Sequence, residues 1–473
     1  MNNRYVTGLL MGLVALDLAF TFWQHYRLPL DGDLVAIVLP APWYSQVLHA
    51  PFGWAVLTKH EAYSATNRFF AHATMSLYWK VVPGLLQRVV APITSLYVAS
   101  ALFATATQAA LTLVLASYVS RAGGERASGP GFWLVAALLR PFFQTSTRLY
   151  EQIGVTDHAI TYTFFYAWPL LLVLVLFWPF FRAACQQQPL RLPAWRALLL
   201  GALMVVVAFN GPLAGAVVAI VLVSVGGRWL WGWWQPSQRA RWLSGQAQGL
   251  LAVLGLLTLY SLYLGRYNSE NVHTHSLGEL YRLLPEGLAR LLIIHAGLPL
   301  LLGALLLSLW LVRRTAAPGQ GQVLRWLGWS AAAAALYLLL LPLGGYRSYR
   351  PYLLRYDTFL PVTLALLLAY GVAVRYLLRH LAGGRRGAYL AVVLLFGAYL
   401  TGVDFGVDPT YNHDCERQAL ATLAQAPEPV VQLPASCSVL AWGPLATAPE
   451  SERTAAMLYY WGITPSPKLY FQQ

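Results

Sequence analysis

The sequence is poor in charged residues, and acidic residues are the rarer kind. Asp, Glu, Lys and Arg make up 11% of the 473 residues, with 18 acids against 32 bases; soluble domains carry about 25% charged residues. Apolar residues reach 58%, and the mean hydropathy is +0.53. A water-soluble fold cannot bury that much apolar surface, so the composition excludes a soluble enzyme and predicts an all-α polytopic membrane protein.

Cysteine is equally scarce, which excludes a secreted disulfide scaffold. Of the three cysteines, Cys185 falls on the predicted cytoplasmic side, where it stays reduced. Cys415 and Cys437 fall on the opposite, oxidising side. Their spacing alone leaves open whether they form a disulfide or remain two free thiols.

Long apolar runs are abundant, and each bilayer crossing needs roughly 20 such residues. We predict about eleven transmembrane helices, at 5–24, 92–120, 131–147, 161–181, 197–209, 212–227, 247–264, 291–312, 326–345, 357–378 and 388–403. Asn210-Gly211-Pro212 divides one long run, because Gly-Pro breaks a helix. We interpret that run as a hairpin of two short helices rather than one kinked span.

The distribution of charge sets the expected orientation. With the N-terminus inside, the cytoplasmic segments hold 16 Lys and Arg residues and one acid, Glu125, whereas the outer segments hold 16 basic and 16 acidic residues. The positive-inside rule therefore favours N-in, C-out. The same pattern explains the net charge of +14 without nucleic acid as a partner.

Three long segments are predicted outside. The first outer loop, 25–91, contains amphipathic, aromatic-rich stretches typical of interfacial helices. A second lies at 265–290. Residues 404–473 form a small extracytoplasmic tail after a transmembrane domain of residues 1–403.

The cytoplasmic segments contain no P-loop and no GxGxxG turn, so a nucleotide has no evident site there. We expect any chemistry at the outer face. Asp31-Gly32-Asp33 is the sharpest candidate: two carboxylates two residues apart can serve as a general base or hold a divalent metal ion. The alternative is a helix cap by Asp33, which would make Asp31 the better base.

Two further outer clusters carry chemistry-bearing side chains. In Asp157-His158 a carboxylate can orient an imidazole for proton transfer, or the pair is an ordinary solvated loop. Arg347, Arg350 and Arg355, interleaved with Tyr346 and Tyr349, suit recognition of a lipid phosphate. The alternative there is anchoring at the membrane interface.

This layout resembles the GT-C superfamily of membrane glycosyltransferases, and is similar to protein mannosyltransferases and the aminoarabinose transferase of lipid A. The likeness lies in the first-loop acid pair, the Gly-Pro hairpin and the run Arg355-Tyr356-Asp357-Thr358-Phe359-Leu360-Pro361. The sequence departs from the family pattern at Asn210, where many members have Lys, and it lacks a Trp-Trp-Asp motif.

The resemblance implies transfer of a sugar from a polyprenyl-phosphate carrier to a lipid, glycan or protein acceptor. It implies a place in the cell inner membrane, among membrane lipids, with the active site on the extracytoplasmic face. Asp31 or Asp33 would be the base, and the Arg/Tyr cluster would bind the lipid phosphate. Two rivals stay open: a flippase for a lipid-linked intermediate, and an O-antigen ligase or polymerase.

Overall fold

The computed structural model describes residues 3–125, 129–145, 153–235, 240–272, 274–294, 296–405 and 410–473. Within these ranges nine helices are long and apolar enough to cross a membrane. They are α1 (Asn3–Tyr26), α6 (Pro92–Ala122), α8 (Ile160–Tyr162) running on through η2 (Thr163–Ala167) into α9 (Trp168–Gln186), α11 (Pro212–Trp234), α12 (Gly245–Gly265), α14 (Gly297–Arg314), α15 (Gln320–Leu340) with η4 (Leu341–Gly344), α16 (Tyr356–His380) and α17 (Gly383–Phe405). The prediction of a helical, multi-pass membrane protein is confirmed.

Two of the eleven predicted spans are shorter apolar helices, α7 (Pro130–Leu139) with its 3₁₀ turn η1 (Arg140–Phe142), and α10 (Ala194–Ala208). The predicted span 131–147 was too long. Pro141 follows Arg140 directly and the α-helix ends there, because proline cannot supply the next backbone donor. A short strand, β1 (Gln144–Thr145), follows and pairs with β2 (Gly154–Thr156). The end of the predicted span, 146–147, lies outside the described residues.

The break at Asn210-Gly211-Pro212 is present. Gly211 has a φ of 107°, a conformation that side chains disfavour, and α11 begins at Pro212. Two hydrogen bonds place the two ends of α10. Just before the helix, the carbonyl of Leu192 accepts from the side chain of Gln246 at the start of α12. Just after it, the carbonyl of Phe209 accepts from the backbone N–H of Phe70 in the first loop. The backbone N–H of Gly211 in turn donates to Asn67. Consequently α10 and α11 run in opposite directions, as the hairpin interpretation requires.

The first outer loop forms four helices, α2 (Asp33–Val38), α3 (Pro42–His49), α4 (Trp54–Lys59) and α5 (Phe69–Leu86). The first amphipathic part of this loop is divided between α2 and α3, because the chain breaks at residues 39–41. The second loop contains another helix, α13 (Leu277–Ile293), which starts at a capping box between Ser276 and Glu279. The predicted start of the next span at residue 291 was therefore wrong: the amphipathic α13 occupies that region, and α14 begins at Gly297.

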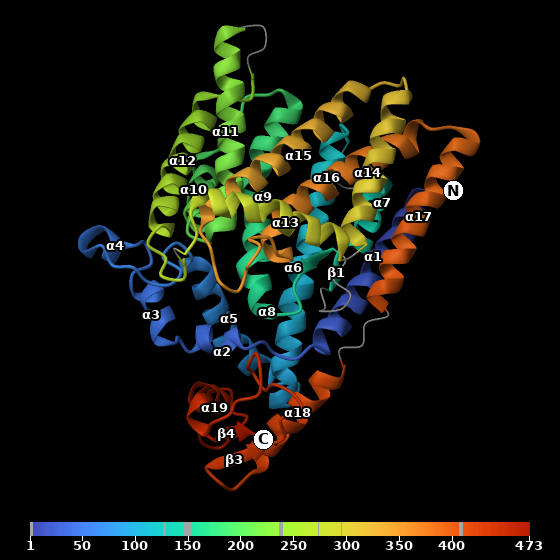
Figure 1. Cartoon of the computed structure of the whole chain (residues 1–473). Coiled ribbons are helices and arrows are strands. Elements are labelled where there is room, and N and C mark those ends of the chain that lie inside the picture. The colour runs from blue at the N-terminus through green and yellow to red at the C-terminus, as the bar shows by residue number, and fades with distance from the viewer. Residues whose placement is uncertain are drawn as a thin grey trace.

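The C-terminal segment consists of α18 (Thr410–Gln425), β3 (Val430–Leu433), the 3₁₀ turn η5 (Ala448–Ser451), α19 (Glu452–Tyr460) and β4 (Leu469–Gln472). The two strands pair in parallel. Cys415 and Cys437, left open by their spacing, are joined by a disulfide. Figure 1 shows these elements at the same end of the bundle as α2 and α5.

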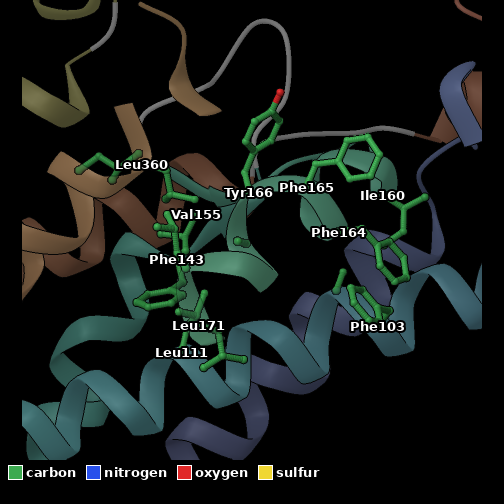
Figure 2. Close-up of a cluster of buried hydrophobic side chains, with 14 of the residues drawn as sticks. Phe103, Leu111, Phe143, Val155, Ile160, Phe164, Phe165, Tyr166, Leu171 and Leu360 are labelled. Atoms are coloured by element: carbon green, nitrogen blue, oxygen red, sulfur yellow. The ribbon is translucent and has the colours of Figure 1, made fainter. Parts of the chain in front are cut away.

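The core follows the long helices. A cluster of buried aromatic and aliphatic side chains lies between α6, the π-helical turn η2 and α16 (Figure 2). The ring of Phe164 stacks on that of Phe103 with centroids 3.5 Å apart. This packing fixes η2 (Thr163–Ala167), and π-helical turns inside α-helices often occur at functional sites.

The direction of insertion remains a prediction, which reporter fusions test. We expect a reporter placed after Arg386, between α16 and most of α17, to be cytoplasmic because basic residues crowd that end of the bundle. A reporter after Gln473 should be outside. The reverse readings at both positions would show that the molecule inserts the other way round.

Candidate functional site

The first outer loop, the second outer loop and the Arg/Tyr segment meet at one end of the bundle. Tyr63 of the first loop forms a parallel bridge with Asn268 of the second loop. The backbone N–H of Val272 donates to the carbonyl of Tyr346, 2.9 Å away. The second loop thus joins the first-loop acids to the Arg/Tyr segment, and residues far apart in sequence share one polar site.

Asp31, rather than Asp33, makes the helix-capping contacts. Its Oδ1 accepts from the backbone N–H groups of Asp33 and Leu34, each at 3.1 Å. Thr161 donates to it twice, from the hydroxyl at 2.7 Å and the backbone N–H at 3.0 Å. The alternative of a helix cap by Asp33 is therefore wrong: Gly32 occupies the N-cap position, and Asp33 is the first residue of α2.

Burial raises the pKa of Asp31 to about 6, although the bonds from Thr161 act in the opposite direction. A pKa in that range suits a base. Access does not: the residue is only 6% exposed, and both carboxylate oxygens already accept hydrogen bonds. The hydrogen bonds from Thr161 to Asp31 therefore link the first loop to α8 (Ile160–Tyr162), and the role of Asp31 is structural.

Asp33 is only half-buried and faces the polar site. Its Oδ1 accepts from the indole Nε1 of Trp442, 3.1 Å away in the C-terminal segment. Burial raises its pKa; the Trp442 bond and the charge of Arg355 lower it, whereas Glu270 raises it. Asp33 is thus a carboxylate with a raised pKa that lies close to both a guanidinium and a second carboxylate.

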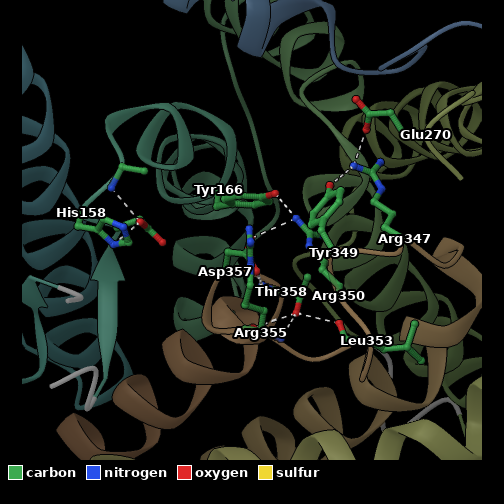
Figure 3. A network of polar contacts seen from close by, with 12 residues as sticks. His158, Tyr166, Glu270, Arg347, Tyr349, Arg350, Leu353, Arg355, Asp357 and Thr358 are labelled. Atoms are coloured by element: carbon green, nitrogen blue, oxygen red, sulfur yellow. Dashed lines mark hydrogen bonds and ion pairs between the residues drawn. The ribbon is translucent and has the colours of Figure 1, made fainter. Parts of the chain in front are cut away.

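The three predicted arginines lie in the same site, and each has a carboxylate partner (Figure 3). Arg347 pairs with Glu270 at 2.5 Å, and its Nη1 donates to the Tyr349 hydroxyl at 2.8 Å. Arg350 and Arg355 share the buried carboxylate of Asp357. Burial alone would lower the pKa of Arg350 and of Arg355, but Asp357 outweighs it, so both stay charged.

Two tyrosines contact these arginines, Tyr162 at the end of α8 and Tyr166 in the π-helical turn η2. The hydroxyl of Tyr166 accepts from Nη2 of Arg350, and the guanidinium of Arg355 lies 4.7 Å from the ring centroid of Tyr162. Tyr162 also stacks on Trp442. The site is therefore enclosed by aromatic rings from two distant parts of the chain.

A fourth arginine, Arg68 at the start of α5, completes the positive group. A cavity of about 80 Å³ is lined by Arg68, Arg347 and Arg350, and by apolar residues of α11 and of the end of α15, including Leu213 and Leu340. Arg68 has no carboxylate partner within the described part of the chain, and its buried Nε makes no hydrogen bond there. Four guanidinium groups thus face three carboxylates (Asp33, Glu270 and Asp357), which leaves one positive charge.

The remaining predicted residues lie at the margins. Asp157 accepts from the backbone N–H of Ala159 and pairs with His158 at 3.0 Å. It lines a cavity of only about 10 Å³ together with Tyr166 and Asp357, and it does not line the cavity of Arg68. Tyr346 packs edge-on against His275 instead of joining the arginines.

The carboxylates of Asp31 and Asp33 do not fit the divalent metal ion that the sequence had suggested as an alternative. Across the described ranges no three His, Cys, Asp or Glu side chains converge as metal ligands. The oxygens of Asp31 accept from N–H and O–H donors, whereas Asp33 bonds to an indole. Asp31 and Asp33 therefore do not form a divalent-metal site within the described residues.

Arg68, Glu270 and Trp442 are the site residues that the sequence analysis missed. Each lies in a segment without a recognisable motif. Glu270 is one of three acids in the second loop, and no spacing ties it to Arg347. Trp442 sits in a stretch with no regular secondary structure.

No protein-family model matches this chain, and no curated protein is detectably similar to it. The case for a function therefore rests on the site itself.

Proposed function

We propose that the protein is a membrane glycosyltransferase that moves a sugar from a polyprenyl-phosphate carrier to an acceptor at the outer face of the membrane. One observation carries the proposal: the half-buried Asp33 lies in the same site as a cavity lined by three arginines. A base and an anion site side by side are what transfer from a phosphate-linked donor requires.

The anion site suits a lipid phosphate. Arginine binds phosphate oxygens through two parallel N–H bonds, and Arg68 has no carboxylate that competes for it within the described residues. Apolar side chains from α11 (Leu213) and α15 (Leu340) line the same cavity. A phosphate on an isoprenoid chain would place its charge at the arginines and its tail between these helices.

Asp33 would take the proton from the acceptor hydroxyl as that oxygen attacks the anomeric carbon. The bond from the anomeric carbon to the phosphate oxygen then breaks, and polyprenyl phosphate leaves with the electron pair. The guanidinium groups of Arg68 and Arg350 would stabilise the leaving phosphate. Attack opposite the leaving group inverts the anomeric centre.

The flippase alternative gains no support from the middle of the bundle. Asp17 of α1 pairs with Arg140 of η1. Arg140 also donates to Thr21 and Gln108. A charge pair held by this many contacts stabilises the packing of α1 against α6 and α7, and it does not resemble a mobile carrier site.

The direct test is transfer by the reconstituted full-length protein with a labelled polyprenyl-phosphate sugar. We expect Arg68→Gln to raise the KM for the donor by roughly 10- to 100-fold, because a charge-assisted contact of about 1.5–3 kcal/mol is lost. Arg88→Gln, which removes an exposed arginine of the same loop, should leave the KM unchanged. No transfer from any polyprenyl-phosphate sugar, or equal KM values for the two variants, would count against the proposal.

The pH dependence tests the role of Asp33 separately. The Trp442 bond lowers the pKa of Asp33, so Trp442→Phe should raise it. A base must be ionised to act, so the acidic limb of kcat/KM should move to higher pH in this variant. Trp461→Phe is the matched control, because it also removes an indole N–H from the C-terminal segment, but one that donates to the carbonyl of Trp79. An identical pH profile in both variants would remove Asp33 as the titrating base.

A further inference from the structure

A second and larger cleft lies at the opposite end of the bundle from Asp33. It has a volume of about 610 Å³ and is formed by the C-terminal half of α9 and the first half of α10. Three arginines, Arg182, Arg191 and Arg196, line it. The rest of the wall is largely apolar and includes Val175, Trp178, Leu199, Leu200 and Leu203.

The cleft is built into the fold. The segment that connects α9 to α10 is fastened to the start of α12 by side-chain bonds. The Gln246 amide accepts from the backbone N–H of Leu192 at 2.8 Å and donates to its carbonyl at 2.9 Å. Ser244 donates to the carbonyl of Leu190 at 2.7 Å. These bonds hold Arg191 in place without a ligand, as in most small-molecule sites.

The charge of the cleft is uncompensated. None of its three arginines forms an ion pair with a described carboxylate. Glu125, the one acid predicted on this side, is engaged by Arg375 and Arg379. An anion is therefore the natural occupant.

The apolar wall indicates which anion. Leu199 belongs both to the cleft and to an outward face of α10, where Leu198 is 75% exposed and Leu199 61% exposed. In a membrane protein such a face contacts lipid chains. A small soluble anion would leave the exposed side chains of Val175 and Leu199 uncovered, whereas a molecule with an anionic head and an apolar tail satisfies both halves of the cleft.

We propose that this cleft binds an anionic phospholipid from the adjoining leaflet, with its phosphate at Arg182, Arg191 and Arg196 and an acyl chain along α10. Basic pockets between transmembrane helices bind such head groups elsewhere. The site is separate from the candidate catalytic site and does not depend on the proposed function.

Native mass spectrometry of the full-length protein, titrated with phosphatidylglycerol in detergent, tests the proposal. Each arginine near a lipid head group contributes about fivefold in affinity. The combined variant Arg182→Gln, Arg191→Gln and Arg196→Gln should therefore bind on the order of 100-fold more weakly. The control combines Arg313→Gln, Arg314→Gln and Arg325→Gln, which removes three exposed arginines from the last turn of α14 and the second turn of α15. It should bind as the unaltered protein does.

A second arm separates a lipid from a free anion. Leu199→Asn should weaken binding of a long-chain phosphatidylglycerol but not of a short-chain one. An equal loss of affinity for phosphatidylglycerol in the two triple variants would mean that the lipid responds only to the overall surface charge, which would contradict the proposal. Unchanged binding in the cleft variant, or inorganic phosphate that binds as tightly as the lipid, would overturn the proposal. Because all three arginines are exposed, each variant should elute as the unaltered protein does in size-exclusion chromatography.

Discussion

Asp33→Asn should reduce turnover of the donor sugar by roughly 10²- to 10⁴-fold, the usual contribution of a general base. The variant keeps an oxygen that accepts from Trp442, so the local structure should persist. Donor binding, measured with labelled polyprenyl phosphate, should be unchanged. Single-turnover transfer with saturating donor gives the rate of the chemical step directly.

Asp31→Asn is the informative contrast, because that residue is the more buried member of the pair. Its amide would place an NH₂ group against N–H donors that now bond to the carboxylate. We expect a loss of about 1–3 kcal/mol in stability and only a secondary effect on turnover. Wild-type turnover in Asp33→Asn would refute the assignment and leave Asp157 as the next candidate.

Asp357→Ala should destabilise the protein by about 3–5 kcal/mol, because one buried carboxylate compensates both Arg350 and Arg355. Side-chain exposure is 2% for Asp357 and 10% for Arg350, so water cannot replace the lost partner. The free energy of unfolding in mixed micelles, followed by tryptophan fluorescence, measures the effect.

The loss of stability in Asp357→Ala is to be compared with that in Glu286→Ala, which removes an exposed ion pair. Glu286 forms an ion pair with Arg290 on α13, and both side chains are about half exposed (50% and 48%). Removing a pair of this kind costs about 0.2–1 kcal/mol. Equal losses in the two variants would mean that the Asp357 cluster is hydrated and contributes little to the fold.

The sequence was sufficient to predict where most of the membrane-spanning helices lie, but not where each helix begins and ends. Apolar runs of roughly 20 residues mark a crossing whatever surrounds them, and the break at Gly211 follows from local backbone chemistry. The start of α14 was misplaced because residues 291–294 are apolar in both an amphipathic helix and a span. Hydropathy cannot distinguish these, since the difference lies in which neighbours cover the apolar face.

The site was predicted in pieces. Asp33 and the arginines stood out because each belongs to a short pattern of chemically related residues. Their partners did not, because Arg68, Glu270 and Trp442 reach the site only through contacts between loops. The roles of Asp31 and Asp33 were interchanged in the prediction for a similar reason. Thr161, which lies 130 residues from Asp31 in the sequence, donates hydrogen bonds to the Asp31 carboxylate. Asp33 is therefore the acid that faces the arginines.

The bond between Trp442 and Asp33 also has a consequence for biosynthesis. The two residues are 409 positions apart, so the first half of the site is synthesised and inserted long before the second half leaves the ribosome. Until then Asp33 lacks its indole partner and Tyr162 its stacked ring. During insertion the nascent chain therefore carries an incomplete polar site. The site is complete only when the C-terminal segment packs on the first loop.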